Sequence, residues 1–312
     1  MSKHIRYNIQ NFNKKDLQNT FKRIKRAGFS GVVIPAARPF ISDLNGECEF
    51  FPVDELAYLA REQDLDLTLE FNIFESWYVW KHQNFSAPVK FNNSPYYPAQ
   101  EKNYYPICPN NPLAEKRIER ILSLLETVPE SVALLISEMG FPFNWMENNL
   151  DIQNSHPPFC YCPFCLGEFS EYIDELVTEP QQVENNFRYW MDWRINVIYK
   201  YFVDIFSNLI DNPLIISIPP LSLIDLPFVT GQIPIAFLRE DARIAPPLLH
   251  VSKNKNFRWV IDQLRHYELE MDENDLIPIL ELNSDKVDNL EFIEKRGYQD
   301  VIYDDWDKFL EL

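Results

Sequence analysis

The feature that most constrains the fold is a regular alternation of two kinds of segment along the chain. Short runs rich in β-branched and aromatic residues, typical of strands, are separated by longer stretches with helical periodicity. We predict strands at His4–Ile9, Gly31–Pro35, Leu65–Phe71, Val132–Ser137, Leu214–Ile218, Ala245–Val251, Leu276–Leu282 and Asp300–Tyr303. We predict helices at Lys14–Ala27, Val53–Gln63, Leu113–Val128, Phe164–Val177, Asn185–Ile210, Phe257–Asp272 and Lys286–Arg296. This pattern indicates an α/β protein.

Eight predicted strands separated by helical segments favour a (β/α)8 TIM barrel that occupies residues 1–312 as a single domain. A doubly wound open sheet is the main alternative, because it is built from the same units. The sixth unit, Ile224–Asp241, contains prolines and predicts only a weak helix. Two helix ends carry their usual signals: Gly28 follows the basic end of the first helix, and Asn111 with Pro112 begins the third.

Composition excludes several classes of function. The chain has only seven glycines and lacks both of the glycine-rich motifs that bind phosphate groups. A net charge of −18 opposes binding to nucleic acid or to an anionic membrane surface, because both require Lys and Arg to neutralise phosphate. No apolar stretch approaches the ~20 residues of a transmembrane helix, and the polar N-terminus lacks the apolar core of a secretory signal. We therefore expect a cytoplasmic protein and leave its oligomeric state open.

One connection is too long for a simple loop between a strand and a helix. Residues Glu75–Cys108 show little periodicity but contain many aromatic side chains, among them Trp77. Loops of this length are usually functional or disordered, and the aromatic content argues against disorder. The segment would follow the third strand, on the face of a barrel where active sites are built. A platform for sugar rings and a small separate core are both consistent with it.

Three of the five cysteines are grouped after the fourth predicted strand, at Cys160, Cys162 and Cys165. Such short spacing lets several thiolates converge on one ion, and a structural zinc ion needs four ligands. Cys108 and His156 are the candidates for the fourth ligand. The alternative is that these are free buried thiols, since cysteine packs readily as a small apolar residue.

Two predicted strands end in glutamate. Glu138 follows the aliphatic run of the fourth strand, and Glu281 ends the aliphatic run of the seventh. In a barrel the carboxyl ends of the strands face the active site, and two opposed carboxyl groups there suit the cleavage of a glycosidic bond. A separation of about 5–5.5 Å between them would indicate retention of configuration. The alternative is a pair of ordinary glutamates, solvated or paired with arginine.

Three segments together resemble a known family. Residues Ile136–Gly140 (ISEMG), followed by Cys160–Cys165 (CYCPFC), are similar to the core of family 42 glycoside hydrolases, the zinc-containing β-galactosidases. Those enzymes carry an Asn-Glu-Tyr-Gly motif before a Cys-Tyr-Cys-Pro-His-Cys cluster. An earlier Tyr-Cys-Pro-Asn-Ser-Pro segment completes their zinc site, and Ile107–Pro112 (ICPNNP) resembles it. The specific match covers roughly Cys108–Leu166, and it is also close to glycosidase-like barrels with a Cys-x-Cys-Pro-x-Cys-Leu segment.

The resemblance implies roles for particular residues. Glu138 would be the general acid/base, and Glu281 stands where clan A glycosidases place the nucleophile. The ligands of a structural zinc ion would be four thiolates: Cys108, Cys160, Cys162 and Cys165. The leading prediction is thus a retaining glycoside hydrolase that acts on a carbohydrate substrate.

The chain departs from the family pattern at several points. Ser137 replaces the asparagine that binds the sugar 2-hydroxyl group, and a serine lacks the amide's paired donor and acceptor. The sixth strand ends at Leu249–Ser252 without the tyrosine that commonly supports the nucleophile, and the accessory domains are not expected. These departures motivate an alternative, a non-catalytic carbohydrate-binding or scaffolding barrel that keeps the zinc site.

A metal-dependent hydrolase of the amidohydrolase type is less well supported, because the five histidines form no H-x-H motif.

Further substrate contacts are expected from residues that follow strands. Arg38 could contact substrate or form a surface salt bridge, and His250 could bind substrate or serve a structural role. Trp306 stands where a platform for a sugar ring would lie, although a packed tryptophan is equally consistent. With Ser137 and Trp77, these residues make up the predicted substrate-binding set.

Overall fold

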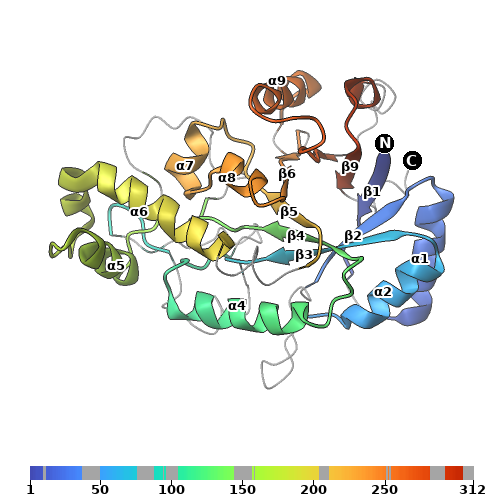
Figure 1. Ribbon diagram of the computed structural model, residues 1–312, viewed down its shortest axis with the longest axis horizontal. Coiled ribbons are helices and arrows are strands. Elements are labelled where there is room, and N and C mark those ends of the chain that lie inside the picture. The colour runs from blue at the N-terminus through green and yellow to red at the C-terminus, as the bar shows by residue number, and fades with distance from the viewer. Residues whose placement is uncertain are drawn as a thin grey trace.

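The computed structural model describes residues 1–9, 12–36, 50–75, 88–93, 95, 105–143, 157, 159–203, 211–250, 252, 254–281 and 292–304. Its strands form one parallel sheet in the order β6-β5-β4-β3-β2-β1-β9-β8-β7. The first and last strands are therefore neighbours, and Figure 1 shows dark blue β1 beside dark red β9. The strands are β1 Ser2–Arg6, β2 Gly31–Pro35, β3 Asp66–Asn72, β4 Ala133–Ser137, β5 Leu214–Ser217, β6 Arg243–Ala245, β7 Pro247–Leu248, β8 Ile279–Glu281 and β9 Asp300–Asp304.

The sheet closes at the sixth strand of the barrel, which is divided into β6 and β7. β6 pairs with β5, and β7 pairs with β8. A parallel bridge joins Ile244 to Leu276, and the N–H of Ile277 donates to the carbonyl oxygen of Ile244 at 2.8 Å. The fold is therefore the predicted (β/α)8 barrel, which excludes the open sheet.

The boundaries of the sixth strand differ from the prediction of Ala245–Val251. The strand begins earlier, at Arg243, and ends at Leu248. Pro246 divides the two pieces, and neither Pro246 nor Pro247 has an N–H to donate to a neighbouring strand. The described residues that follow Leu248 belong to a loop at the carboxyl end of the barrel.

Helices cover the outside of the barrel (Figure 1). They are α1 Lys14–Arg26, α2 Val53–Glu62, α4 Pro112–Leu125, α5 Pro163–Ile173, the 3-10 helix Pro180–Asn186, α6 Phe187–Lys200, α7 Asp225–Thr230, α8 Pro234–Leu238 and α9 Phe257–Glu268. The predicted start of α4 is confirmed, because Asn111 caps it and Pro112 is its first residue. The helix predicted from Asn185 begins at Phe187, after the 3-10 turn. No helix of the described chain is long and apolar enough to cross a bilayer.

Two apolar layers hold the barrel together. The outer layer lies between the strands and the helices and includes most of the buried side chains. The inner layer fills the barrel itself with one or two residues from most strands: Val33, Leu135, Ile215, Ala245, Ile277, Ile279 and Ile302. Because side chains alternate between the two faces of a strand, the next inward positions toward the carboxyl ends lie above this inner layer.

The amino end of the barrel carries a small charged cluster. Asp300, the first residue of β9, accepts a hydrogen bond from Nη1 of Arg243 at 2.5 Å. Nε2 of His4 lies 3.7 Å from the same carboxylate. His4 first, and then the contacts with Arg243, hold the pKa of Asp300 well below its usual value, although partial burial opposes them. This cluster joins β1, β6 and β9 at the end away from the candidate active site.

Candidate active site and metal centre

The carboxyl end of the barrel is lined by polar side chains that lie above the inner apolar layer. They are contributed by the inward positions at the carboxyl ends of five strands, of which β3 supplies two: Arg6, Glu70, Asn72, Ser137, Glu281 and Asp304. Glu70, Ser137 and Glu281 are buried there. Buried carboxylates are costly unless they are paired, and each of these makes at least one defined contact. The arrangement provides several carboxylates and hydrogen-bonding groups in one place.

Arg6 joins two of these carboxylates. One of its terminal nitrogens, Nη2, lies 2.7 Å from Oε2 of Glu70, and Nη1 lies 3.5 Å from Oδ1 of Asp304. Since these residues come from β1, β3 and β9, the arginine connects strands on both sides of its own. It fixes two acidic side chains and leaves their negative charge partly compensated.

Ser137 lies in a chain of hydrogen bonds that continues along β3. Its Oγ is 3.0 Å from Oε1 of Glu70 and 2.5 Å from Oδ1 of Asn72, so its single proton can be donated to either. Asn72 is the register partner of Ser137 in the neighbouring strand. Nδ2 of Asn72 in turn donates to Oε2 of Glu75 at 3.0 Å.

Glu75 ends this chain, at the start of the long connection after β3. Its Oε1 accepts a hydrogen bond of 3.4 Å from the backbone N–H of Tyr105. Burial raises the pKa of Glu75 to about 7, although the Tyr105 N–H and the charge of Arg117 oppose this shift. The side chain is therefore poised to gain or lose a proton near neutral pH.

The second predicted catalytic residue, Glu281, is the last residue of β8 and is buried. It accepts two hydrogen bonds from Ser252, one from the backbone N–H at 2.8 Å and one from Oγ at 2.5 Å. Its register partner in β9 is Asp304. The carboxylate is thus held at the carboxyl end of the barrel by a residue of the loop that follows β7.

Glu138 follows β4 and is half-buried. Its backbone has φ of +53°, a left-handed conformation that costs energy for a residue other than glycine and that is often found at functional sites. Glu138 lines a pocket that encloses about 320 Å³, part of it open to solvent. The pocket lies over the ends of β4, β5 and β7, and its other lining residues are Met139, Gly140, Phe141, Phe143, Ser217, Pro219, Thr230, Gln232 and Pro247.

The other predicted substrate-binding residues divide into two groups. Arg38, Trp77 and Trp306 lie outside the described residues, as does most of the aromatic connection between β3 and α4. His250 is buried in the loop after β7, where its ring packs edge-to-face against Phe257 with a centroid separation of 5.7 Å.

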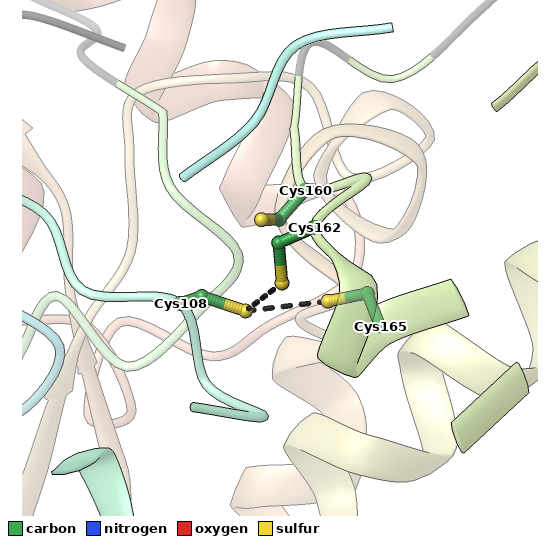
Figure 2. Close-up of side chains that lie close together, drawn as sticks. All are labelled: Cys108, Cys160, Cys162 and Cys165. Carbon is green, nitrogen blue, oxygen red and sulfur yellow. Dashed lines mark hydrogen bonds between the residues drawn. The ribbon is translucent and has the colours of Figure 1, made fainter. Parts of the chain in front are cut away.

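The structure brings all four predicted cysteine ligands together (Figure 2). Their sulfur atoms lie within 4.8 Å of one another, and all four residues are buried. Cys108 Sγ is 3.2 Å from Cys165 Sγ and 3.5 Å from Cys162 Sγ. Thiolates bound ~2.3 Å from one zinc ion lie about 3.8 Å apart in a tetrahedron, so the spacing suits a metal ion. The alternative fourth ligand, His156, lies outside the described residues.

Local structure explains how the cysteines converge. Cys162 is the N-cap of α5, and Pro163 sets the first helical position. Cys165 therefore lies in the first turn, where the helix dipole favours negative charge. Two donors also reach these sulfurs: Asn110 Nδ2 lies 3.5 Å from Cys165 Sγ, and the N–H of Val89 lies 3.3 Å from Cys160 Sγ.

The electrostatics of the cluster also suit a cation. Burial raises the pKa of Cys108 and of Cys165 well above the usual value of a thiol. Hydrogen bonds from the other three thiols, that of Cys108 first, lower the pKa of Cys162. Such a site holds several thiolates in a dry environment only when a metal ion compensates their charge. The donor set and the burial therefore fit a metal centre.

Several residues of the polar layer were not predicted from the sequence. Glu70 and Asp304 are charged residues within or at the end of an apolar run of a strand, and that contrast is the signal that could have identified them. Arg6 ends a largely polar strand and gives no such signal. Ser252 gives no comparable signal, because a serine in a polar loop is common.

Comparison with known proteins supports a glycosidase-like barrel. No protein-family model matches the sequence, and no curated protein matches it. Among solved structures, the chain is similar to the glycoside hydrolase domain of PgaB (BpsB) from Bordetella bronchiseptica, with a TM-score of 0.64 and 12% identity over 100% of this chain and 95% of that one.

The chain is also similar to the structures of two other kinds of glycosidase. A β-galactosidase from Bacillus circulans sp. alkalophilus has a TM-score of 0.54 at 10% identity, over 79% of this chain and 39% of its own. An α-L-fucosidase isoenzyme from Paenibacillus thiaminolyticus has a TM-score of 0.54 at 11% identity, over 98% of this chain and 46% of its own. The fold is thus shared with several kinds of glycosidase, and family 42 is not singled out.

Proposed function

We propose that this protein is a retaining glycoside hydrolase that acts on a carbohydrate at the carboxyl end of its barrel. The observation that carries the proposal is the polar layer there, in which Glu281 is oriented by Ser252. Glu138 lines the pocket over the ends of β4, β5 and β7. Fold alone does not determine function, and the proposal depends on these two carboxyl groups.

In the proposed reaction Glu138 donates a proton to the oxygen of the leaving group. A carboxylate oxygen of Glu281 attacks the anomeric carbon as the bond to the leaving group breaks, which forms a covalent glycosyl-enzyme. Glu138 then removes a proton from water, which attacks the same carbon and releases Glu281. Apolar lining residues, such as Phe141 and Phe143, suit the environment of a general acid.

Asn72 has a specific place in this proposal. The family resemblance puts an amide side chain at position 137, where this chain has serine. Asn72 lies beside Ser137 in the adjacent strand and shares a hydrogen bond with it. We assign to Asn72 the contact with a sugar hydroxyl group, because its amide has a second N–H to offer besides the one donated to Glu75.

For the cysteine centre we propose zinc in a structural role. Thiolate ligands favour zinc over harder ions, and four protein ligands leave no open position for a catalytic water. Bound zinc would supply charge compensation and cross-linking, with Cys108 from one connection joined to the three cysteines before and within α5. A cytoplasmic location is part of the proposal, because thiols stay reduced there.

The test of the catalytic proposal uses Glu281→Gln with Glu119→Gln, an exposed residue on α4, as the matched control. Turnover is measured on a panel of aryl glycosides. We expect Glu281→Gln to lose nearly all turnover while the control keeps it. If Glu281→Gln turns over the substrate as the parent does, the assignment fails. Sugar binding without turnover across the whole panel would instead support the non-catalytic carbohydrate-binding barrel.

The test of the metal proposal is elemental analysis of purified protein. We expect one zinc ion per chain in the parent protein and in Cys48→Ser, which changes the one cysteine of the sequence outside the predicted ligand set. Cys162→Ser is expected to lose most of the metal. Stoichiometric zinc in the Cys162→Ser variant would contradict the site.

A further inference from the structure

Arg194 is a cation buried in the middle of the protein. It lies on α6, and none of its surface is exposed. Its Nη1 donates to the carbonyl oxygen of Phe159, and its Nη2 donates to that of Val229 at 2.7 Å. The guanidinium also lies over the ring of Phe141, 4.0 Å from the centroid. Three separate segments therefore hold this one side chain.

The charge of Arg194 needs a partner, because an unpaired buried charge is strongly destabilising. In the described part of the chain no carboxylate forms an ion pair with it. Burial lowers the pKa of Arg194 to about 10, and the groups that oppose this shift are Tyr161 and the thiols of the cysteine centre. The arginine is thus still charged at neutral pH, and its Nη1 is held on the carbonyl oxygen of Phe159, the residue immediately before the candidate ligand Cys160.

The geometry points to Arg194 as the counter-cation of the metal-loaded cysteine centre, and as the link that couples this centre to the wall of the Glu138 pocket. Four thiolates around one divalent ion leave two negative charges uncompensated, and a buried guanidinium offsets part of them. The inference rests on the proposed metal site. It assigns a positioning role to Arg194, and neither a catalytic nor a metal-ligating one.

The link to the pocket follows the chain from the contacts of Arg194. Val229, whose carbonyl oxygen accepts from Arg194, precedes Thr230, and Thr230 lines the Glu138 pocket. The carbonyl oxygen of Thr230 accepts a hydrogen bond of 2.8 Å from the N–H of Phe141. On the other side, Arg194 holds the carbonyl of Phe159, the residue before Cys160. A change at the cysteine loop is therefore expected to reach Thr230 and Phe141, which both line the pocket.

Close packing makes this link stiff. A Cβ atom added at Gly231 would lie 2.9 Å from the carbonyl oxygen of Arg194, and the φ of Gly231 is +76°. At Gly140 an added Cβ would lie 3.0 Å from Cβ of Thr230. Only glycine fits both positions without displacement, so α6, α7 and the loop after β4 are closely packed against one another.

The first experiment measures zinc affinity by competition with a chromophoric chelator in the full-length protein. We compare Arg194→Gln, which keeps hydrogen-bond donors without the charge, with Arg194→Lys, which keeps the charge. Arg265→Gln, an exposed residue on α9, is the control. We expect about 10–100-fold weaker binding in Arg194→Gln, as for other groups around metal ligands, and less than about threefold loss in Arg194→Lys. Parent-like affinity in Arg194→Gln, or equal losses in both variants, overturns the charge assignment.

The second experiment needs no variant, so it does not depend on the folding of an altered chain. Hydrogen exchange is measured in the parent protein before and after zinc is removed by a chelator. We expect faster exchange at the Phe141 amide as well as in the cysteine loop. Faster exchange in the cysteine loop alone overturns the coupling. A parent protein that binds no zinc overturns the metal site itself, which distinguishes the failure of that proposal from the failure of this one.

Discussion

Ser252 donates two hydrogen bonds to Glu281, from its backbone N–H at 2.8 Å and from its hydroxyl group at 2.5 Å. The two residues are far apart in the sequence and come from adjacent units of the barrel. Both oxygens of the buried carboxylate are engaged, so the side chain is fixed in one orientation. Such positioning is what a nucleophile requires, because a small displacement of the attacking atom reduces the rate strongly.

Ser252→Ala removes the hydroxyl donor and leaves the backbone donor in place. A hydrogen bond to a charged group contributes about 1.5–3 kcal/mol, so we expect kcat/KM on an aryl glycoside to fall roughly 10–100-fold. Ser123→Ala, at an exposed serine on α4, serves as the control. Unchanged kcat/KM in Ser252→Ala, with a folded protein by circular dichroism, would contradict the proposal that Ser252 orients Glu281 for catalysis.

Asn72→Ala removes the amide that we assign to sugar binding. The variant also takes away the acceptor for Ser137 and a donor for Glu75. We expect kcat/KM to fall about tenfold or more on a substrate with all its hydroxyl groups, and by less on the matching 2-deoxy substrate. An equal loss on both substrates would show that Asn72 does not contact the 2-hydroxyl group.

Glu75→Gln is expected to stabilise the protein at high pH. The unfolded chain releases this proton near pH 4.5, whereas the pKa of Glu75 in the folded state is about 7. The folded state therefore binds more protons between these values, and the free energy of unfolding decreases as pH rises through that range. A neutral glutamine avoids this loss, so urea unfolding at pH 8 should show a gain of about 1–2 kcal/mol. Near pH 4.5 the gain should disappear, and a gain independent of pH would contradict the assignment.

Asp300→Asn is expected to have the opposite dependence on pH. The pKa of Asp300 is lowered in the folded state, by His4 first and then by Arg243. Its contribution to the free energy of unfolding is therefore complete above the unfolded pKa of 3.8, and it is lost as pH falls through the folded value. Because the cluster is partly exposed, we expect a cost of about 1 kcal/mol at pH 7. The difference between parent and variant should narrow below pH 3, as followed by urea unfolding.

Local patterns were enough to predict the barrel and the convergence of the four cysteines. The apolar runs of the strands and the periodicity of the helices are set by neighbouring residues, so both are visible in the sequence. The spacing of Cys160, Cys162 and Cys165 likewise follows from one loop and the first turn of α5. Element boundaries were predicted less well, as in the sixth strand, where two prolines changed the boundaries.

The tertiary structure alone decided which distant residues meet. The contacts of Arg6 with Glu70 and Asp304 depend on the order in which the strands close into a barrel, which no local pattern encodes. Arg194 lies in a helix that the sequence presents as core, between Trp190 and Ile198, and only packing shows that it donates to the carbonyl oxygen of Phe159, next to Cys160. The sequence by itself determined the elements and the chemistry available at their ends. Closure of the barrel determined the partners, because register and distance between strands are properties of the whole sheet.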